Sequence, residues 1–179
     1  MYTKDQLNRW LQEERNNLIA IRIPVSSEIC PEIRFSKATS WYGQCRQNQV
    51  YHGMRYKFQI SISEYHLQSS ERAIRNTLVH ELLHTCPGCL NHGPKWKAYA
   101  AQIQHQLGYN IMRTGGDKDK DSAMEAARRE KREGYQTKYL LVCTQCGQEF
   151  ARFRKSKLVL HPEKYRCKCG GKIKHKRKI

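Results

Sequence analysis

The sequence contains no hydrophobic run long enough to cross a membrane, and its first ten residues, MYTKDQLNRW, lack the apolar segment of a secretory signal peptide. These absences predict a cytosolic protein, cytoplasmic in location and without a membrane partner. The cytosol keeps thiols reduced, so the eight cysteines are not expected to form a disulfide framework. Spacings such as Cys143-x-x-Cys146 are better explained by metal binding.

Acidic residues are scarce, because 16 Asp+Glu stand against 33 Lys+Arg and the formal net charge is +17. The excess is uneven: residues 1–112 hold 13 Lys+Arg and 8 Asp+Glu, whereas residues 113–179 hold 20 and 8. A basic region of this kind attracts polyanions, and nucleic acid is the expected partner. The alternative is a solvated basic tail that only aids solubility.

The chain length fits a medium domain followed by a small appendage. Residues 1–112 are expected to form the larger domain. Residues 113–137 have mixed charges and almost no large apolar side chains, which predicts a linker that is partly helical at most. Residues 138–179 form a small cysteine-bearing unit with 13 Lys+Arg and 2 Asp+Glu.

Helical and strand patterns both occur in the first 112 residues, which predicts an α+β fold with helices packed on a small antiparallel sheet. The expected helices span residues 4–19, from Ser69 or Ser70 to about Cys86, and from Pro94 to Gly108. The expected strands lie near residues 33–35, 39–47 and 56–63. In the last strand, Phe58, Ile60 and Ile62 alternate with polar residues, which predicts a half-buried strand.

His80, Glu81 and His84 form a His-Glu-x-x-His motif within the second predicted helix. Residues four apart lie on the same helix face, so His80 and His84 can bind one metal ion. Glu81 lies beside them and can reach a metal-bound water without being a ligand. The motif predicts a zinc peptidase helix, whereas the alternative is an amphipathic helix with chance histidines.

A catalytic zinc ion usually takes a third protein ligand and leaves one position to water. No carboxylate occurs between Glu81 and Asp117, which excludes a nearby downstream glutamate. The candidates that remain are Cys86, Cys89, His92 and His105. We favour His92, because glycine and proline on both sides of it allow the chain to fold back towards the metal.

These residues resemble the SprT-like, or Spartan, family of zinc metallopeptidases. The segment His92-Gly93-Pro94-Lys95-Trp96 matches the family's His-Gly-Pro-x-aromatic pattern, and Trp41-Tyr42-Gly43-Gln44-Cys45 is similar to its Trp-Gly-x-Cys strand with one residue inserted. The resemblance implies a zincin-like catalytic domain followed by a small β zinc ribbon, with substrates that are DNA-bound proteins, including proteins crosslinked to DNA.

Cys86 and Cys89 lie between the second and third predicted ligands, in a Cys-Pro-Gly-Cys sequence. Three interpretations stay open. A disulfide can stiffen the loop, a thiolate can compete for the open metal position, or the cysteines can be small buried hydrophobic residues in a tight turn.

A second metal site is predicted near the C-terminus, where Cys143-Thr-Gln-Cys146 and Cys167-Lys-Cys169 are separated by twenty residues. This arrangement is typical of a zinc ribbon with four thiolate ligands, although the second pair has one intervening residue instead of two. His161 is a possible substitute ligand. The alternative is a basic tail with free cysteines.

Basic and aromatic residues are interleaved around this second site, an arrangement suited to phosphate contacts and base stacking. The predicted partner is DNA, single-stranded or distorted and without sequence preference, because no base-reading helix is evident. Some of the aromatics, Phe150, Phe153 and Tyr165, are also candidates for the ribbon's own core. The candidate contacts are Arg152, Arg154, Lys155, Lys157, Arg166, Lys172 and Lys174.

Taken together, the motifs predict a zinc-dependent metalloendopeptidase that acts as a monomer, and the family resemblance implies that its substrates are DNA-associated or DNA-crosslinked proteins. One zinc ion would be catalytic, bound by His80, His84 and His92 with Glu81 as general base, and one would be structural. The alternative is a non-catalytic zinc-ribbon protein, nucleic-acid-binding or transcription-related, with a vestigial zincin domain. A peptidase aimed at one soluble regulator is a third possibility.

Overall fold

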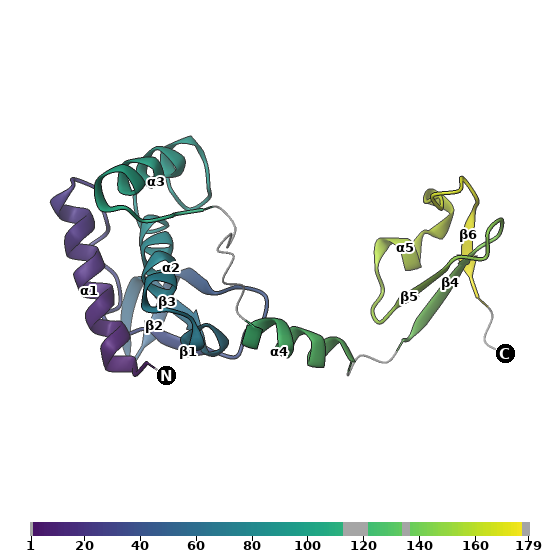
Figure 1. Ribbon diagram of the computed structural model, residues 1–179, viewed down its shortest axis with the longest axis horizontal. Helices are drawn as coiled ribbons and strands as arrows, with labels where there is room; N and C mark the ends of the chain where they lie inside the picture. The colour runs from purple at the N-terminus through teal and green to yellow at the C-terminus, as the bar shows by residue number, and fades with distance from the viewer. Residues whose placement is uncertain (1, 113–121, 134–136, 177–179) are drawn as a thin grey trace. The chain divides into compact units, whose positions relative to one another are not determined.

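The computed structural model describes residues 2–112, 122–133 and 137–176. The chain divides into two compact units, Met1–Arg128 and Arg129–Ile179. Helices and small sheets occur in both, so the predicted α+β class is confirmed (Figure 1).

The first helix, α1 (Lys4–Ala20), is confirmed almost residue for residue. Thr3 caps it, because its side-chain oxygen accepts a 3.2 Å hydrogen bond from the backbone N–H of Gln6. Its buried stripe packs into the core of the first unit and includes Leu7, Leu11 and Leu18, all fully buried.

Three strands form the sheet of the first unit: β1 (Arg34–Ser36), β2 (Gly43–Tyr51) and β3 (Met54–Ser63). Their order is β1-β3-β2; β2 pairs antiparallel with β3, whereas β1 pairs parallel with it. The second strand begins four residues later than predicted and ends in a tight turn. His52 and Gly53 have φ angles of 47° and 76° there, as a type I′ hairpin turn requires.

The prediction that β3 is half-buried is wrong, because its polar residues are buried too. Gln59 is 1% exposed and Ser63 is fully buried. The cause is the chain on either side of β1. The Gln59 side chain donates a 2.6 Å hydrogen bond to the Glu32 carbonyl before the strand, and the Ser63 hydroxyl donates one of 2.6 Å to the Ala38 carbonyl after it.

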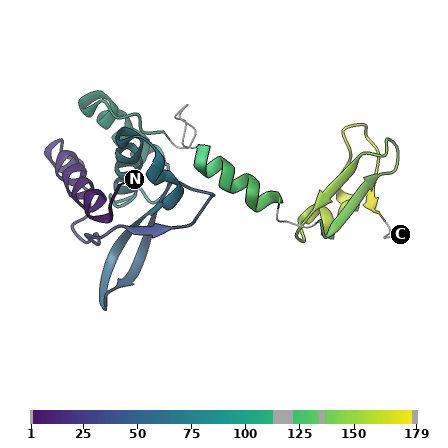
Figure 2. The same cartoon turned by 60° about the horizontal axis from the view of Figure 1, so that its bottom comes forward.

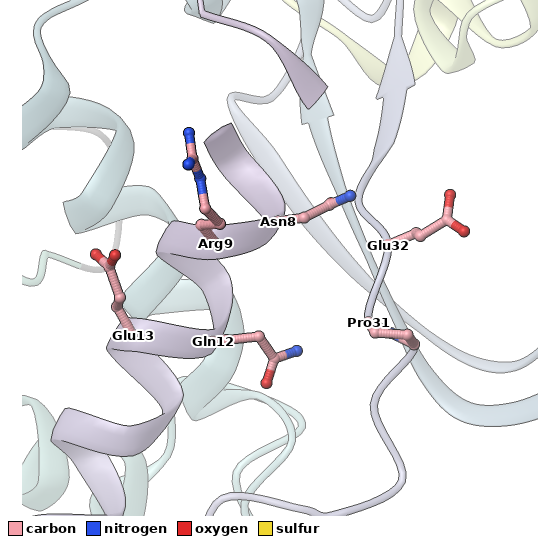
Figure 3. Close-up of a pocket in the computed structure, with 6 residues that line it drawn as sticks. All are labelled: Asn8, Arg9, Gln12, Glu13, Pro31 and Glu32. Atoms are coloured by element: carbon pink, nitrogen blue, oxygen red, sulfur yellow. The ribbon is translucent and has the colours of Figure 1, made fainter. Parts of the chain in front are cut away.

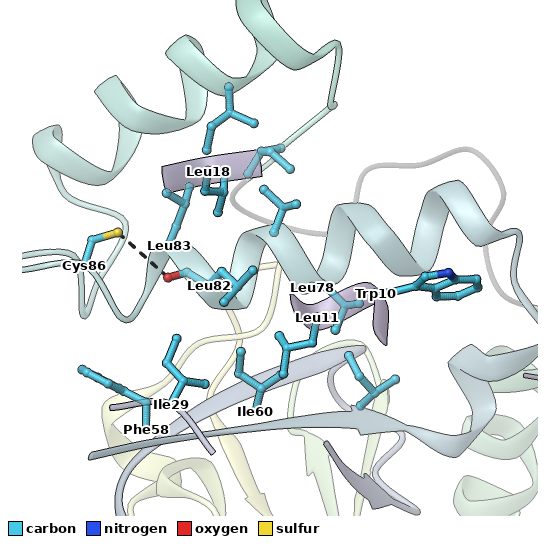
Figure 4. Close-up of a cluster of buried hydrophobic side chains, with 14 of the residues drawn as sticks. Trp10, Leu11, Leu18, Ile29, Phe58, Ile60, Leu78, Leu82, Leu83 and Cys86 are labelled. Carbon is cyan, nitrogen blue, oxygen red and sulfur yellow. Dashed lines mark hydrogen bonds between the residues drawn. The ribbon is translucent and has the colours of Figure 1, made fainter. Parts of the chain in front are cut away.

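A short 3-10 helix, η1 (Glu64–Gln68), leads into α2 (Glu71–Leu83), which is capped by Ser70. Its Leu78 and Leu82 lie over Ile60 in the core (Figure 4). The helix ends at Leu83, three residues before the predicted end, and His84 is its C-cap. The backbone then tightens into i→i−3 hydrogen bonds that reach Cys86.

The third helix, α3 (Pro94–Leu107), begins with proline and ends at Gly108, whose φ of 70° is left-handed. Its buried side includes Trp96 and Ile103, as predicted.

Part of the expected linker forms a helix, α4 (Ser122–Glu133). Met124 is fully buried, and the Arg128 guanidinium donates a hydrogen bond to the Thr39 carbonyl. Residues 113–121 and 134–136 lie outside the described residues. The division between the two units falls inside α4, so the predicted domain boundaries stay a prediction.

The second unit contains a sheet of β4 (Tyr139–Cys143), β5 (Glu149–Arg152) and β6 (Ile173–His175) in the order β5-β4-β6, antiparallel throughout. Two short helices, α5 (Lys157–Leu160) and η2 (Pro162–Lys164), precede β6. Its small core consists of Leu141, Val159 and Ile173, with Phe150 packed against it.

Among the described residues, no helix combines the length and the apolar character that crossing a membrane would require.

Candidate metal centre

Three histidines converge in the first unit: His80 in α2, His84 at its C-cap and His92 in the loop before α3. Their candidate ligand nitrogens all lie within 4.8 Å of one another. Nε2 of His80 is 3.3 Å from Nε2 of His84 and 2.9 Å from Nε2 of His92. Zinc–nitrogen bonds of 2.0–2.1 Å in a tetrahedron would place two nitrogens about 3.3 Å apart, so the cluster fits such an ion.

The backbone around the cluster sets the histidine tautomers. Nδ1 of His84 lies 2.8 Å from the Cys89 carbonyl, which can only accept a hydrogen bond, so Nδ1 carries the proton and Nε2 keeps its lone pair for a metal. The Met112 backbone is likewise hydrogen-bonded to His80. Burial, together with the neighbouring His84 and His92, lowers the pKa of His80 to about 4. Burial also lowers the pKa of His84, so both rings favour the neutral form that binds metals.

Among the described residues, the other proposed third ligands are not part of this cluster. His105 lies in the last turn of α3, and Cys86 and Cys89 belong to the hydrophobic core. The structure therefore brings His92, and none of the alternatives, to His80 and His84.

Glu81 lies beside the cluster with only 6% of its surface exposed. Burial raises the pKa of its carboxyl group to about 8, and a hydrogen bond from the backbone of Cys45 opposes this shift. A buried carboxylate held by a backbone N–H, and without a lysine or arginine partner in the described structure, is suited to accept and release a proton.

The start of β2 contacts Glu81, a role that the sequence did not predict for this strand. Gly43 at the start of β2 packs so closely against α2 that an added Cβ would lie 2.6 Å from Cγ2 of Thr77 and 2.8 Å from Cγ of Glu81. Two residues later, Cys45 supplies the N–H for the carboxylate. Only the folded sheet brings these backbone groups to the helix.

Trp96, on the buried side of α3, contacts all three histidines, a role that the sequence did not predict. Its ring centroid is 4.5 Å from that of His92, 5.0 Å from that of His80 and 6.0 Å from that of His84, on which it stacks. The side chain is 2% exposed. Within the described part of the chain, its buried Nε1 has no hydrogen-bond partner.

His66 is a buried histidine near α2, and the sequence offered no signal for it. Its Nε2 lies 2.9 Å from the hydroxyl of Thr77, and its Nδ1 lies 2.9 Å from the hydroxyl of Ser69. Thr77 precedes Glu81 by one helical turn, so these contacts hold the part of α2 that faces Gly43.

The Cys86–Cys89 loop matches the third of its three interpretations. Both cysteines are free and buried, at 2% and 0% exposure. Burial raises the pKa of Cys86 to about 12 and also raises that of Cys89, which disfavours a thiolate at either position. What the loop provides to the cluster is the Cys89 carbonyl that orients His84.

The second candidate metal site lies in the second unit, where four cysteines bring their sulfur atoms within 4.8 Å of one another. Sγ of Cys143 is 3.5 Å from Sγ of Cys169, and Sγ of Cys146 is 3.6 Å from Sγ of Cys167. Zinc–sulfur bonds of 2.3 Å imply a separation of about 3.8 Å in a tetrahedron, so the set fits a closed site. His161 is not part of the cluster and lies 3.4 Å from Glu163.

The short second cysteine pair is accommodated by the two glycines that follow it. Gly170 has a left-handed φ of 84°, and a Cβ on Gly171 would lie 2.5 Å from Sγ of Cys143. Backbone N–H groups of Cys146 and Gln145 lower the pKa of Cys143 to about 6, which favours the thiolate that a metal requires.

The predicted nucleic-acid contacts are distributed along the second unit and not gathered at one position in the chain. Arg152 ends β5, Lys157 begins α5 and Lys174 lies in β6, while Arg154, Lys155, Arg166 and Lys172 lie in connecting segments. Among the aromatics, Phe150 packs on the core, but Phe153 and Tyr165 are 42% and 38% exposed. DNA contact by these residues stays a prediction.

A pocket of about 480 Å³ opens between α1 and the segment before β1 (Figure 3). Its polar groups serve the fold: the Asn8 side chain accepts a 2.8 Å hydrogen bond from the Ile33 N–H, and Glu32 binds Lys4 at 2.5 Å. None of its lining residues belongs to either metal cluster; they are Asn8, Arg9, Gln12, Glu13, Pro31 and Glu32.

Comparison with known proteins agrees with this geometry. The model of the SprT-like family matches residues 5–115, which include α1, the sheet of the first unit, α2, α3 and all three histidines. A search of curated proteins found no match. A zincin-like metallopeptidase fold is associated with this family. Because the match covers more than half of the 179 residues, the chain belongs to the SprT-like family.

Proposed function

We propose that the protein is a zinc-dependent metalloendopeptidase that cleaves DNA-associated or DNA-crosslinked proteins. The observation that carries the peptidase part is the position of Glu81. A structural metal site needs no carboxylate next to its ligands, yet Glu81 is buried beside the histidine cluster and bonded to a backbone N–H.

His80, His84 and His92 would hold the catalytic zinc ion, and Glu81 would act as general base. A zinc ion bound there would supply Lewis-acid polarisation of the scissile carbonyl and a water of near-neutral pKa. Glu81 takes the proton of the attacking water and passes it to the leaving amine. Cys45 keeps the carboxylate aimed during this exchange, and the Cys89 carbonyl and Trp96 keep the histidine rings in place.

The DNA part of the proposal rests on charge. Residues 138–179 carry 13 Lys+Arg and 2 Asp+Glu on a small unit that contains the four-cysteine site. A structural zinc ion there would supply the folding free energy that a core of three buried residues cannot. Exposed Phe153 and Tyr165 among these cations suit base stacking.

The test compares the full chain with Glu81→Gln on a DNA-bound protein, with and without DNA, alongside zinc content per chain. The wild type is expected to bind two zinc ions and to cleave, and the variant to keep both ions while its rate falls by about 10²- to 10⁴-fold.

Three outcomes contradict parts of the proposal. Equal lack of cleavage by both proteins would favour a non-catalytic zinc-ribbon protein that binds nucleic acid. One zinc ion per chain would remove the ribbon site. Cleavage that does not depend on DNA would point to a soluble protein substrate.

A further inference from the structure

A second basic surface belongs to the first unit, whereas the cysteine cluster belongs to the second. Between residues 33 and 63 the chain has five Lys+Arg and no Asp or Glu, although residues 1–112 as a whole hold 13 and 8. Three of the five cations, Arg46, Arg55 and Lys57, lie on β2 and β3. The excess charge of the first unit is therefore concentrated on one hairpin.

The register of this hairpin places the three cations on one face. Arg46 pairs with Gln59, and Val50 pairs with Arg55, four residues further along each strand. Side chains two or four residues apart share a face of a strand, so Arg46, Arg55 and Lys57 point to the same side. All three are exposed. Figure 2 shows the hairpin, in slate blue, extending away from the helices that cover the rest of the sheet.

The fold makes little use of these charges. Lys57 lies 3.3 Å from Glu28, but both side chains are more than half exposed, so the pair is weak. Arg34 stiffens the hairpin: its guanidinium donates a 2.8 Å hydrogen bond to the Val50 carbonyl and lies 4.8 Å from the centre of the Tyr51 ring.

The tip of the hairpin is apolar and exposed. Val50 is 55% and Met54 is 58% exposed, on either side of the type I′ turn at His52 and Gly53. A two-stranded ribbon fits a DNA groove, and apolar side chains inserted between base steps are a known means of binding distorted duplexes. A basic stem with an apolar tip matches both requirements.

We propose that the β2–β3 hairpin is a second DNA-binding surface, located in the catalytic unit itself. Arg46, Arg55 and Lys57 contact backbone phosphates, and Val50 and Met54 enter a groove of a duplex. The inference rests on the proposed function in taking DNA as the partner. This surface would hold DNA on the strand that contacts Glu81. Gly43 packs against Glu81 and the Cys45 backbone is hydrogen-bonded to it, and both lie on β2 with Arg46.

The test measures binding of a fluorescent duplex to the full chain across a salt series, on the Glu81→Gln background so that nothing is cleaved. Arg46→Gln combined with Arg55→Gln is expected to weaken binding and to reduce the slope of log K against log[salt] by about 1.8, or about 0.9 per phosphate contact. The matched control, Arg9→Gln with Lys97→Gln, removes two exposed cations of the same unit and should leave the slope unchanged.

Replacing the tip residues, Val50→Ser with Met54→Ser, should weaken duplex binding without changing the slope, because no charge is lost. Unchanged affinity would overturn insertion of the tip. Thermal unfolding and zinc content identify a misfolded variant, and Arg46→Lys with Arg55→Lys should restore the slope.

An equal change in the hairpin variant and the control would overturn the inference, as would a wild type that does not bind DNA. Peptidase activity is read separately, from cleavage by the protein with Glu81 intact. Loss of cleavage in the hairpin variant on a DNA-free substrate would instead assign the surface to acidic protein substrates. If the protein cleaves nothing but the salt slope changes as expected in the hairpin variant alone, the proposed function is wrong and the hairpin inference is still supported.

Discussion

Gly43 and Glu81 are in such close contact that no side chain fits between them. A Cβ at position 43 would lie 2.9 Å from Oε1 of Glu81 and 2.6 Å from Cγ2 of Thr77. Position 43 must therefore lack a side chain for α2 to pack against β2. The position of the Glu81 carboxylate thus depends on a glycine, which has no functional group of its own.

Gly43→Ala is expected to displace Glu81 and to lower kcat by at least about tenfold, because a shift of about 1 Å in a catalytic group is costly. Zinc content should stay the same, since the atoms nearest to a Cβ at position 43 belong to Thr77 and Glu81 and to none of the three histidines. Steady-state kinetics and metal analysis check this, with Gln44→Ala as the neighbouring control. Loss of zinc in parallel with activity would show that the glycine supports the metal cluster instead.

Trp96→Ala should weaken zinc binding by about tenfold or more, because the indole contacts the rings of all three candidate ligands and supports their orientation. Trp96→Phe should recover most of the affinity. Competition with a chelator of known affinity measures the Kd. If both variants bind zinc as tightly as the wild type, the ring has only a packing role, which the unfolding temperature would then report.

The Cys86–Cys89 loop is predicted to act through its backbone. Cys86→Ala with Cys89→Ala should keep both zinc affinity and rate within about twofold, because the group that orients His84 is a carbonyl. Gly88→Ala should lower the affinity, since Gly88 has a φ of 78°, which costs an alanine about 1 kcal/mol or shifts the loop. Oxidant sensitivity that disappears in the double variant would restore the redox interpretation.

Ion pairs of Arg75 connect α2 to α1. Its guanidinium lies 2.5 Å from the fully buried carboxylate of Glu14 and 2.8 Å from the carboxylate of Glu13. Arg75→Met should reduce the free energy of unfolding by about 3–5 kcal/mol, because it leaves the Glu14 carboxylate buried without a cationic partner, with only the neutral side chains of Asn17 and Tyr109 hydrogen-bonded to it. Adding Glu14→Gln should recover part of the loss. Glu13→Ala, at an exposed position, should cost less than about 1 kcal/mol in urea unfolding.

Cys169→Ser is expected to release one zinc ion per chain and to unfold the second unit, while the ion at the histidine cluster stays bound. His161→Ala should change neither count, since His161 lies outside the sulfur cluster. Metal analysis and amide spectra of both variants distinguish the two ligand sets. If His161→Ala instead loses one zinc ion per chain, His161 is a ligand of the second site.

The sequence was sufficient wherever a local pattern determines the structure. The start of the first helix at residue 4, the start of the second after Ser70, the end of the third at Gly108 and the spacing of His80 and His84 are local, and all were found in the structure. His92 could be favoured because glycine and proline on both sides of it allow the chain to fold back towards the metal.

Features created by tertiary contact could not be predicted. The burial of Gln59 and Ser63 depends on a segment that folds back over β3, and neither residue signals this in sequence. The same holds for Gly43, Cys45 and Trp96, whose roles arise from elements far apart in the chain. The end of α2 was predicted three residues too late, because residues 84–86 continue in the helical direction with i→i−3 hydrogen bonds instead of α-helical ones.

Because α2 ends at Leu83, the three histidines belong to three kinds of backbone: His80 to the helix, His84 to its cap and His92 to a loop. A cation shared by them would be a cross-link that closes this loop and joins two helices. The stability of this region would then depend on the concentration of free metal. Each tenfold rise of that concentration above the Kd would stabilise the folded state by about 1.4 kcal/mol. The amount of folded protein would thus depend on the metal supply of its surroundings as well as on the chain itself.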